Sequence, residues 1–310
     1  MDAQNNQPTI INPSPSIITI GTFDGVHLGH QVILKKLVSI ATQEKLQAVL
    51  LTFFPHPRMV LQKETNLKLI NTIEEKKQLL QKIGIQKIVV LPFTKEFSRL
   101  TALEFVRDIL VHQLHIKTII IGYDHRFGRN REATIDDLKV FGKTFNFEVI
   151  EIDAQLVEEV TVSSTKIRKA LENGNITKAN QFLGYPYMIS GQVVKGKNIG
   201  KTLGFPTANI QVKEDYKLIP KNGVYIVQAT LFNQKVYGIT NIGTNPTLGG
   251  VQKTIETHFL DINDNLYGNK IKIEFLKRIR DEKHFDSIED LKSAIKKDET
   301  FARQFLLNKT

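Results

Sequence analysis

The chain has 310 residues, of which 41% are hydrophobic and 24% charged, and its formal net charge is +10. These proportions are typical of a soluble globular protein, and the length favours two domains over one. The absence of cysteine excludes disulfides and thiolate metal sites and favours a cytoplasmic location. No apolar run approaches the roughly 20 residues of a membrane span, so we expect no membrane partner.

Residues 1–15 are polar and lack the basic start and apolar middle of a signal peptide, so we expect a disordered lead-in. The positive charge makes a nucleic-acid-binding protein an alternative that must be considered. However, the Lys and Arg residues are spread along the chain, without a basic tail or the aromatic–basic interleaving that stacks single strands. This spread favours small phosphate-bearing substrates and no nucleic acid. The sequence leaves the oligomeric state open.

The first distinctive stretch is a turn at residues 21–31, between an apolar strand at 17–20 and an apolar-periodic helix from residue 32. Unpaired N–H groups and the helix dipole make such a turn an anion site. The imidazoles of His27 and His30 add donors for phosphate oxygens, and Gly29 allows a ligand to approach the backbone. A zinc site is one alternative, but neither Cys nor a nearby acidic residue completes a familiar zinc spacing. Two ordinary loop histidines are the other.

Strands and helices alternate through the rest of the first half. The pattern predicts strands at 48–52, 87–91, 118–121 and 147–152, and helices at 72–83, 102–112 and 134–144. Capping boxes, Thr72-x-x-Glu75 and Thr101-x-x-Glu104, open two of the helices. Because each strand is nearly all apolar, we expect a parallel sheet covered on both faces. Ligands of such sheets bind beyond the carboxyl ends of the strands, where three unusual loops lie: 21–31, 53–58 and 122–131.

The second and third of these loops carry side chains that favour ligand recognition. Phe53-Phe54-Pro55-His56-Pro57 offers flat apolar surface and rigid prolines, although a loop that only packs on a neighbour would look the same. Residues 122–131 hold three Arg and two aromatic residues, which favours recognition of phosphates and rings. Further on, three hydroxyls at Ser163–Thr165 open a predicted helix that also carries Lys166 and Arg168. A plain N-cap would need only one hydroxyl, so phosphate binding is favoured there.

From residue 187 the pattern changes to alternation and Gly-rich turns. It predicts strands at 187–194, 224–230, 235–242, 254–260 and 270–275, with a final helix at 287–307, and therefore an antiparallel sheet or barrel. Residues 196–202 resemble a P-loop, but three residues separate the glycines instead of four. The following Leu203-Gly204-Phe205-Pro206 cannot start a stable helix. We expect a Gly-rich flap over phosphates instead.

Two groups of oxygen atoms in this half suit phosphoryl transfer. Thr207 and Asn209 supply hard oxygen ligands for Mg²⁺ beside ATP phosphates. Glu256, His258 and Leu260 would share one strand face, where a carboxylate is able to take the proton of an attacking hydroxyl. A glutamate on a surface strand is inert in most proteins, so its role depends on the surrounding motifs.

Taken together, these motifs carry a family resemblance over residues 16–306. His27-Leu28-Gly29-His30 after Gly-x-Phe-Asp-Gly resembles the HxGH nucleotidyltransferases, and within them the bacterial bifunctional riboflavin kinase/FAD synthetases. Residues 163–168 resemble that family's SSTxIR motif. The riboflavin kinase module is matched in order by 204–209, Gly223-Val224-Tyr225, Asn241-Ile242-Gly243, Glu256-Thr257-His258 and Tyr267-Gly268. The resemblance implies an α/β protein with a Rossmann-like FMN adenylyltransferase domain at 16–185. It implies an antiparallel β-barrel riboflavin kinase domain, ending in a helix, at 186–310.

The resemblance implies two successive reactions. The barrel would transfer the ATP γ-phosphoryl to the 5′-hydroxyl of riboflavin, giving FMN. The first domain would transfer AMP from ATP to the FMN phosphate, giving FAD and pyrophosphate, with the FMN phosphate itself as nucleophile. ATP, riboflavin and FMN would be substrates and Mg²⁺ the cofactor. An alternative is a single-activity enzyme in which one of the two sites is inactive.

The resemblance also implies roles for individual residues. In the adenylyltransferase, His27 and His30 would be catalytic; Gly21, Phe23, Asp24, Gly29, Ser163, Ser164, Thr165 and Arg168 would bind ATP; and Phe54, Pro55, His56, Pro57, Asp124, Arg126 and Phe127 would bind flavin. In the kinase, Glu256 would be the base; Gly196, Gly200, Gly204, Pro206, Thr207 and Asn209 would bind ATP, Thr207 and Asn209 also Mg²⁺; and Asn241, Arg278 and Arg280 would bind flavin. The chain departs from the common pattern at His125, Ala133 and Lys195, where many members have an aromatic residue, Gly and His.

Overall fold

The computed structural model describes residues 14–62, 66–122, 125–152, 162–196, 200, 204–247, 250–262 and 264–308. The chain divides into two compact units, which we call unit 1 (Met1–Leu67 and Lys76–Val162) and unit 2 (Lys68–Glu75 and Ser163–Thr310). Residues 68–75 therefore belong to unit 2 although they come early in the chain. The domain limits expected at 185 and 186 stay a prediction, and residues 1–13 of the expected lead-in lie outside the described residues. Among the described residues, no helix is both long and apolar enough to span a bilayer.

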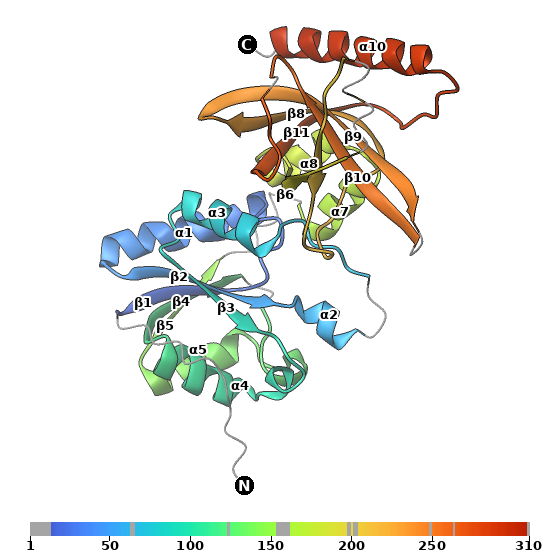
Figure 1. Cartoon of the computed structure of the whole chain (residues 1–310). Coiled ribbons are helices and arrows are strands. Elements are labelled where there is room, and N and C mark those ends of the chain that lie inside the picture. The colour runs from blue at the N-terminus through green and yellow to red at the C-terminus, as the bar shows by residue number, and fades with distance from the viewer. Residues whose placement is uncertain are drawn as a thin grey trace. The chain divides into compact units, whose positions relative to one another are not determined.

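Unit 1 is built on a five-stranded sheet with the order β3-β2-β1-β4-β5 (Figure 1). Its strands are β1 (Ser16–Ile20), β2 (Gln47–Phe54), β3 (Lys87–Pro92), β4 (Ile116–Gly122) and β5 (Glu148–Ile152). Every pairing is parallel, which confirms the predicted sheet. The chain runs outward from β1 to β3 on one side and then from β4 to β5 on the other. The carboxyl ends of β1 and β4 thus flank the switch point, where open α/β sheets bind ligands.

Helices cover both faces of this sheet. α1 (Leu28–Glu44) and α3 (Ile73–Ile83) lie on one face, and α4 (Ala102–Glu104) and α5 (Ile135–Phe145) on the other (Figure 1). Both predicted capping boxes form. The helix predicted at 102–112 differs, because only its first turn is α-helical and η2 (Phe105–Gln113) is a π-helix. Apolar spacing over two turns does not distinguish these helix types.

Shorter elements complete the described part of unit 1. They are α2 (Pro57–Leu61) and two single-turn 3₁₀-helices, η1 (Phe97–Arg99) and η3 (Arg129–Arg131). The core lies between the sheet and its helices. Val49 and Ile119 on the strands are fully buried together with Val106 and Leu110 of the π-helix. The sheet and its helices therefore share one apolar core.

Unit 2 is a closed antiparallel barrel with the strand order β10-β7-β6-β11-β8-β9. Its strands are β6 (Met188–Val194), β7 (Ala208–Gln211), β8 (Gly223–Leu231), β9 (Gln234–Thr247), β10 (Gly250–Phe259) and β11 (Lys270–Arg280). The five predicted strands and the expected antiparallel barrel are confirmed. The sequence pattern does not predict the short β7, which lies within the proposed ATP-binding stretch and joins β10 to β6 in the closed barrel.

The described part of this unit includes the helices α7 (Ser164–Glu172), α8 (Ile176–Leu183) and α10 (Ile288–Leu307). α10 lies against the outside of the barrel (Figure 1). It buries Ala302 against Val224, Ile226 and Ile239. Asn180 joins α8 to β11, because its Nδ2 donates to the Phe275 carbonyl at 2.8 Å. The predicted final helix is confirmed.

Residues 68–75 are held in unit 2 by a buried ion pair. Lys217 Nζ donates to Glu75 Oε2 and to the Ile70 carbonyl, each at 2.6 Å, and at most 1% of either side chain is exposed. The other carboxylate oxygen of Glu75 accepts from Ser190 N–H at 2.9 Å. Leu69 exchanges backbone hydrogen bonds of 2.7 and 2.8 Å with 216–218. The early segment is thus an integral part of unit 2.

Candidate active sites

The turn after β1, beside the switch point, has an unusual backbone. Phe23, Gly25 and Val26 have φ angles of 44°, 87° and 37°, a region that L residues rarely adopt. Gly21 N–H donates to the Leu51 carbonyl at 3.0 Å, so the neighbouring strand fixes where the turn begins. Asp24 is only 1% exposed. Strain of this kind persists where the surroundings hold a functional segment in place.

His27 forms the N-cap of α1, with its Nδ1 accepting from the His30 N–H at 3.4 Å. Because Nδ1 is the acceptor, the proton of the neutral ring lies on Nε2. Burial lowers the pKa of His27 to about 4, and the nearby Asp24 carboxylate opposes this shift more weakly. His27 is therefore neutral near pH 7 and offers one N–H donor at the helix N-terminus.

His30 stacks on His27 with ring centroids 3.6 Å apart, and Phe23 contacts it with a centroid distance of 4.9 Å. Burial, followed by the charge effects of His27 and Lys76, holds the pKa of His30 well below its usual value. Its Nδ1 is buried and has no hydrogen-bond partner among the described residues. Buried polar atoms without partners are rare, so this nitrogen marks a place for a ligand. The expected imidazole pair exists, but both rings are neutral.

Lys76 belongs to this site, and the sequence interpretation missed it. It is 3% exposed, and its Nζ donates to the Thr22 carbonyl at 2.7 Å. Burial lowers its pKa, and the Asp24 carboxylate opposes the shift. In the sequence it looks like part of a solvated charge run, Glu74 to Lys77. The available signal was the helical spacing of Lys76 with the apolar Leu79 and Leu80, which places it on the buried side.

The loop after β2 also begins a helix. His56 is the N-cap of α2 and its Nδ1 accepts from Arg58 N–H at 3.1 Å, while Pro57 occupies the first turn. These contacts give His56 and Pro57 a structural role. Phe54 and Pro55, joined by a cis peptide bond, precede that helix. Flavin binding by this loop stays a prediction.

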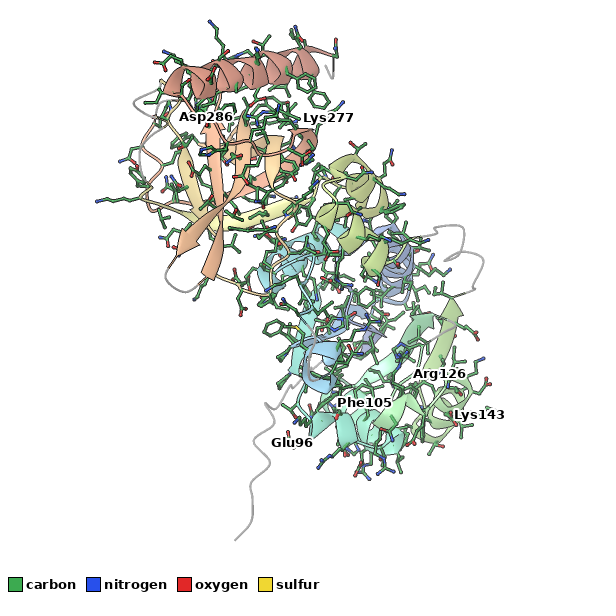
Figure 2. The ribbon with its side chains drawn as sticks, turned by 90° about the vertical axis from the view of Figure 1, so that its right-hand side faces the viewer. Glu96, Phe105, Arg126, Lys143, Lys277 and Asp286 are labelled. Atoms are coloured by element: carbon green, nitrogen blue, oxygen red, sulfur yellow. The ribbon has the colours of Figure 1, made fainter. Side chains whose placement is uncertain are left out.

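The loop after β4 is described from residue 125, so the predicted flavin ligand Asp124 lies outside the described residues. Phe127 is 8% exposed and packs in the core, 6.2 Å from the ring of Phe105. Arg126 is exposed, at the surface of the unit (Figure 2). Phe127 therefore contributes to the base of the loop, and Arg126 is accessible to a ligand.

Residues 163–168 begin α7 in unit 2. Ser163 is the N-cap, and its hydroxyl accepts from Lys166 N–H at 3.3 Å. Arg168 is 9% exposed and its Nε donates to the Lys68 carbonyl at 3.0 Å. Ser164 and Thr165 occupy the first turn of the helix. Ser163 thus caps a helix, and phosphate binding by this segment stays a prediction.

The barrel brings together three residues that the sequence had placed in separate motifs. β10 lies between β7 and β9, and its register pairs Glu256 with Asn209 on one side and Asn241 on the other. Directly paired residues of antiparallel strands point to the same face, with Cβ atoms about 5 Å apart. We call Asn209, Glu256 and Asn241 the barrel row. It places a carboxylate between two amides.

The residues preceding the row are fixed by His258. Its Nδ1 lies 2.9 Å from the Pro206 carbonyl, and because a carbonyl only accepts, Nδ1 carries the proton. The His258 ring also packs edge-on against Phe205, at 5.5 Å between centroids. Sequence reasoning had placed His258 on this face without giving it a role. It holds the backbone just before Thr207.

Two glycines of the predicted flap lie close to residues of the barrel row and of the segment before it. A side chain at Gly196 would overlap the Asn209 amide, and one at Gly200 would overlap the Phe205 carbonyl. Gly204 has a φ of 86°. Residues 197–199 and 201–203 of the flap lie outside the described residues. The described glycines thus leave room for the Asn209 side chain and for the 204–207 backbone.

Arg278 and Arg280 on β11 have partners within unit 2. Arg278 donates to the Asn222 carbonyl at 2.8 Å and to the Asp281 carboxylate at 2.7 Å. Arg280 binds the buried Asp298 of α10 through Nε and Nη2, at 3.0 and 2.8 Å. These contacts stabilise the barrel and its helix. Flavin binding by the two arginines stays a prediction.

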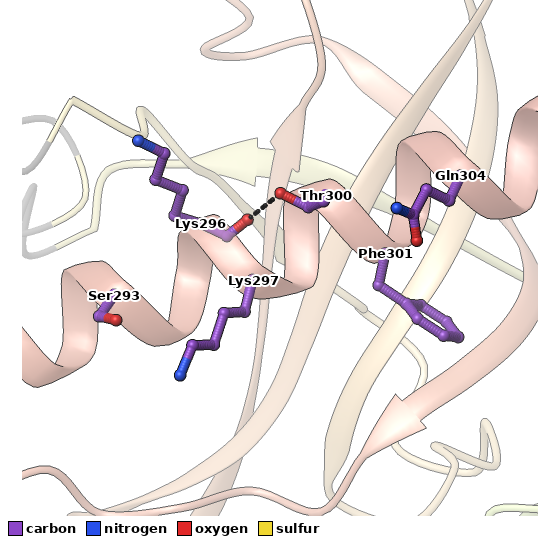
Figure 3. Close-up of a pocket in the computed structure, with 6 residues that line it drawn as sticks. All are labelled: Ser293, Lys296, Lys297, Thr300, Phe301 and Gln304. Atoms are coloured by element: carbon purple, nitrogen blue, oxygen red, sulfur yellow. Dashed lines mark hydrogen bonds between the residues drawn. The ribbon is translucent and has the colours of Figure 1, made fainter.

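A hollow of about 430 Å³ on α10 contains none of the predicted site residues. All of its lining residues come from this one helix (Figure 3): Ser293, Lys296, Lys297, Thr300, Phe301 and Gln304. The Thr300 hydroxyl donates back to the Lys296 carbonyl at 2.9 Å, within the helix. A single helix face offers no converging groups, so we assign no activity to this hollow. Among the described residues, no group of three or more His, Cys, Asp or Glu is placed to hold a metal ion.

Comparisons with known proteins match the chain along nearly its whole length. The FAD synthetase family matches residues 9–166 and the riboflavin kinase family residues 183–306. A bifunctional riboflavin kinase/FMN adenylyltransferase of Buchnera aphidicola subsp. Schizaphis graminum is 41% identical, with 94% of each chain covered. The protein of that name from Listeria monocytogenes is 39% identical over 93% of this chain and 92% of its own. The crystal structure of a protein named macrolide-efflux protein, from Streptococcus pneumoniae, has a TM-score of 0.84 at 33% identity, with 95% of each chain covered.

Proposed function

The chain belongs to the family of bifunctional riboflavin kinase/FMN adenylyltransferases, and on that premise we propose how its residues divide the two reactions. It phosphorylates riboflavin to FMN with ATP, and it transfers AMP from ATP to FMN, giving FAD and pyrophosphate. Both families match their own part of the chain, so the single-activity alternative is not favoured. We assign adenylyl transfer to the turn after β1 and phosphorylation to the barrel row.

The stacked His27–His30 pair is the observation that supports the first assignment. In adenylyl transfer, an FMN phosphate oxygen attacks the α-phosphorus of ATP and pyrophosphate leaves, so negative charge grows on phosphate oxygens. His27 offers its Nε2–H at the N-terminus of α1, where helix dipole and N–H groups favour anions. His30 offers a ring that is fixed between His27 and Phe23. Donors preorganised in this way stabilise the transition state without moving.

The barrel row supports the second assignment. Glu256 would accept the proton of the riboflavin 5′-hydroxyl as that oxygen attacks the γ-phosphorus. Thr207 and Asn209 fit Mg²⁺, because a hydroxyl and an amide oxygen are hard, neutral ligands that leave room for ATP phosphates. When bound, the ion would neutralise phosphate charge. Gly196 leaves the Asn209 amide the space that it occupies.

The remaining predicted residues keep their roles as proposals. Ser164, Thr165 and Arg168 would contact the triphosphate in adenylyl transfer. Phe54, Pro55 and Arg126 would contact flavin there, and Asn241, Arg278 and Arg280 would do so in the kinase. We further propose a cytoplasmic enzyme that requires no nucleic-acid partner.

Reciprocal variants test the assignment of the two reactions. We expect His30→Ala to lower FAD formation from supplied FMN by ~10²–10³-fold, because one preorganised donor is lost. The same protein should still make FMN from riboflavin. Glu256→Gln should lower FMN formation by ~10²–10⁴-fold and leave FAD formation intact. Chromatography of the flavin products measures both activities in one sample. If either variant loses both activities while its melting temperature is unchanged, the assignment of two separate sites is wrong.

A further inference from the structure

Lys76 is a buried cation in unit 1 that belongs to none of the recognised motifs. Only 3% of it is exposed, and its Nζ donates to the Thr22 carbonyl at 2.7 Å. Taking an ammonium out of water costs several kcal/mol unless its donors and charge are satisfied. A lysine that is buried in spite of this cost is expected to have a structural or catalytic role for its donors or its charge. The position of Lys76 at the turn after β1 indicates what that role is.

The Thr22 carbonyl lies between the end of β1 and the first residue of the turn with a positive φ angle, Phe23. Besides Lys76 it accepts only a longer bond from the Thr52 hydroxyl, at 3.3 Å, among the described residues. The next residue, Phe23, has a φ of 44° and places its ring against His30. The carbonyl that Lys76 holds thus immediately precedes the residue that packs against the imidazole pair.

The Lys76 ammonium also affects the charges around the turn. Asp24 is the carboxylate that attracts it, and that same carboxylate acts on His27. The positive charge of Lys76 acts on His30 as well. One buried cation therefore interacts with the turn, with its carboxylate and with the ring that is offered to substrate.

We propose that Lys76 is a positioning residue for adenylyl transfer: it holds the Thr22 carbonyl, and through the turn it fixes Phe23 and His30 in the geometry that the reaction needs. Lys76 acts through these residues and does not bind the nucleotide itself. This inference rests on the proposed assignment of adenylyl transfer to the turn. Misplacing a reacting group by about 1 Å costs ~10²-fold in rate, which is the size of effect that a lost positioning contact produces.

Steady-state kinetics of Lys76→Met test this role, because Met keeps an unbranched side chain, one atom shorter, and removes both charge and donor. We expect kcat for FAD formation from FMN to fall ~10²-fold, with the KM values for ATP and FMN changed less than about threefold. Lys76→Arg, which keeps a donor and a charge, should recover at least about tenfold of that loss. Far-UV circular dichroism and the melting temperature of the same preparations report whether unit 1 is folded, because FMN formation is assigned to unit 2. Lys82→Met, at an exposed lysine near the end of the same helix, is the matched control and should behave like the unchanged protein.

Two results would overturn the inference. The first is a kcat within about threefold of the unchanged protein in folded Lys76→Met. The second is a large rise in KM for ATP with kcat unchanged, since that pattern indicates direct binding of the nucleotide. The His30→Ala variant distinguishes a failure of the site assignment from a failure of the role proposed for Lys76. If His30→Ala makes FAD normally, the site assignment itself fails; if His30→Ala is inactive and Lys76→Met is normal, only the role of Lys76 fails.

Discussion

The two proposed sites both use ATP, and they are built on different kinds of backbone. In unit 1 the site is a turn with three positive φ angles, joined to the N-terminus of a helix. In unit 2 the core of the site is a row of side chains on regular strands in register. The turn depends on side chains that hold it, such as Lys76 and His27. The row depends on strand register, since a slip of one residue would turn Glu256 to the other face. We therefore expect substitutions to act through local geometry in unit 1 and through the integrity of the barrel in unit 2.

The largest expected effect is a loss of stability in the barrel unit, unit 2. Lys217→Met leaves the Glu75 carboxylate buried without its cation, and breaking a buried pair in this way costs about 3–5 kcal/mol. We expect urea unfolding followed through FMN-forming activity to show that loss. Lys221→Met is the matched control, because its pair with Asp281 at 3.1 Å is exposed and should contribute at most about 1 kcal/mol.

A second substitution tests whether the uncompensated Glu75 carboxylate causes the loss of stability. Adding Glu75→Gln to Lys217→Met removes the uncompensated charge and should recover part of the lost stability. If Lys217→Met and Lys221→Met change the free energy of unfolding equally, residues 68–75 do not support the barrel in the way that the structure indicates.

The next effect is the acid sensitivity of unit 1. His27 has a pKa of about 4 in the folded chain and about 6.5 when unfolded, so the unfolded state binds the proton first as the pH falls. Its contribution to stability is therefore complete above pH 6.5 and is lost progressively between pH 6.5 and 4. At pH 4.5 the loss is about 2–3 kcal/mol. His27→Asn keeps an N-cap acceptor without a titrating ring, so its unfolding free energy should fall less over this interval. Equal pH slopes for both proteins would contradict the prediction.

The smallest expected effects come from a pair of glycines, one in each site. A methyl group at Gly196 would overlap the Asn209 amide, so Gly196→Ala should displace that side chain and lower FMN formation about tenfold. At Gly29 the nearest atoms would be those of the His27 ring at 3.4 Å, an ordinary contact. Gly29→Ala should therefore keep its melting temperature and lower only FAD formation, about tenfold, because the methyl group occupies space that the ligand needs.

Calorimetry measures the melting temperatures of the two glycine variants, and the product assays measure their FMN and FAD formation. A Gly29→Ala protein with normal FAD formation would show that no ligand approaches that part of the backbone. A Gly196→Ala protein with normal FMN formation would show that the Asn209 amide is not required where it lies. Either result would weaken the contrast between the two sites.

Regular features of the fold followed directly from the sequence. The alternation of apolar strands and capped helices predicted the parallel sheet, and Glu75 and Glu104 form the capping-box bonds that their spacing indicated. The motifs containing Asn209, Asn241 and Glu256 could each be recognised separately. Their meeting in one row could not be predicted, because β7 is only four residues long and the sequence gives no register for it.

The features that the sequence did not reveal are mostly buried charges. The helical spacing of Lys76 indicates that it lies on the buried side of its helix, but one sequence does not show which carbonyl or carboxylate will face Lys76 or Lys217. The sequence predicts Arg168 and Arg280 as ligand-binding residues, and the structure shows that they hold the Lys68 carbonyl and Asp298. Tertiary partners distant in sequence decide such roles, and local patterns do not identify those partners.

The placement of residues 68–75 has a consequence for the order in which the nascent chain can fold. Glu75 and Lys217 are 142 positions apart. At about 5–20 residues per second, a ribosome needs about 7–30 s to add that length. All strands of the unit 1 sheet have been synthesised by residue 152, before Lys217 exists. During that interval the Glu75 carboxylate must stay hydrated, and the first turn of α3 has only its own capping box. The arrival of Lys217 then gives the Glu75 carboxylate its buried cation, 142 residues after Glu75 itself was added.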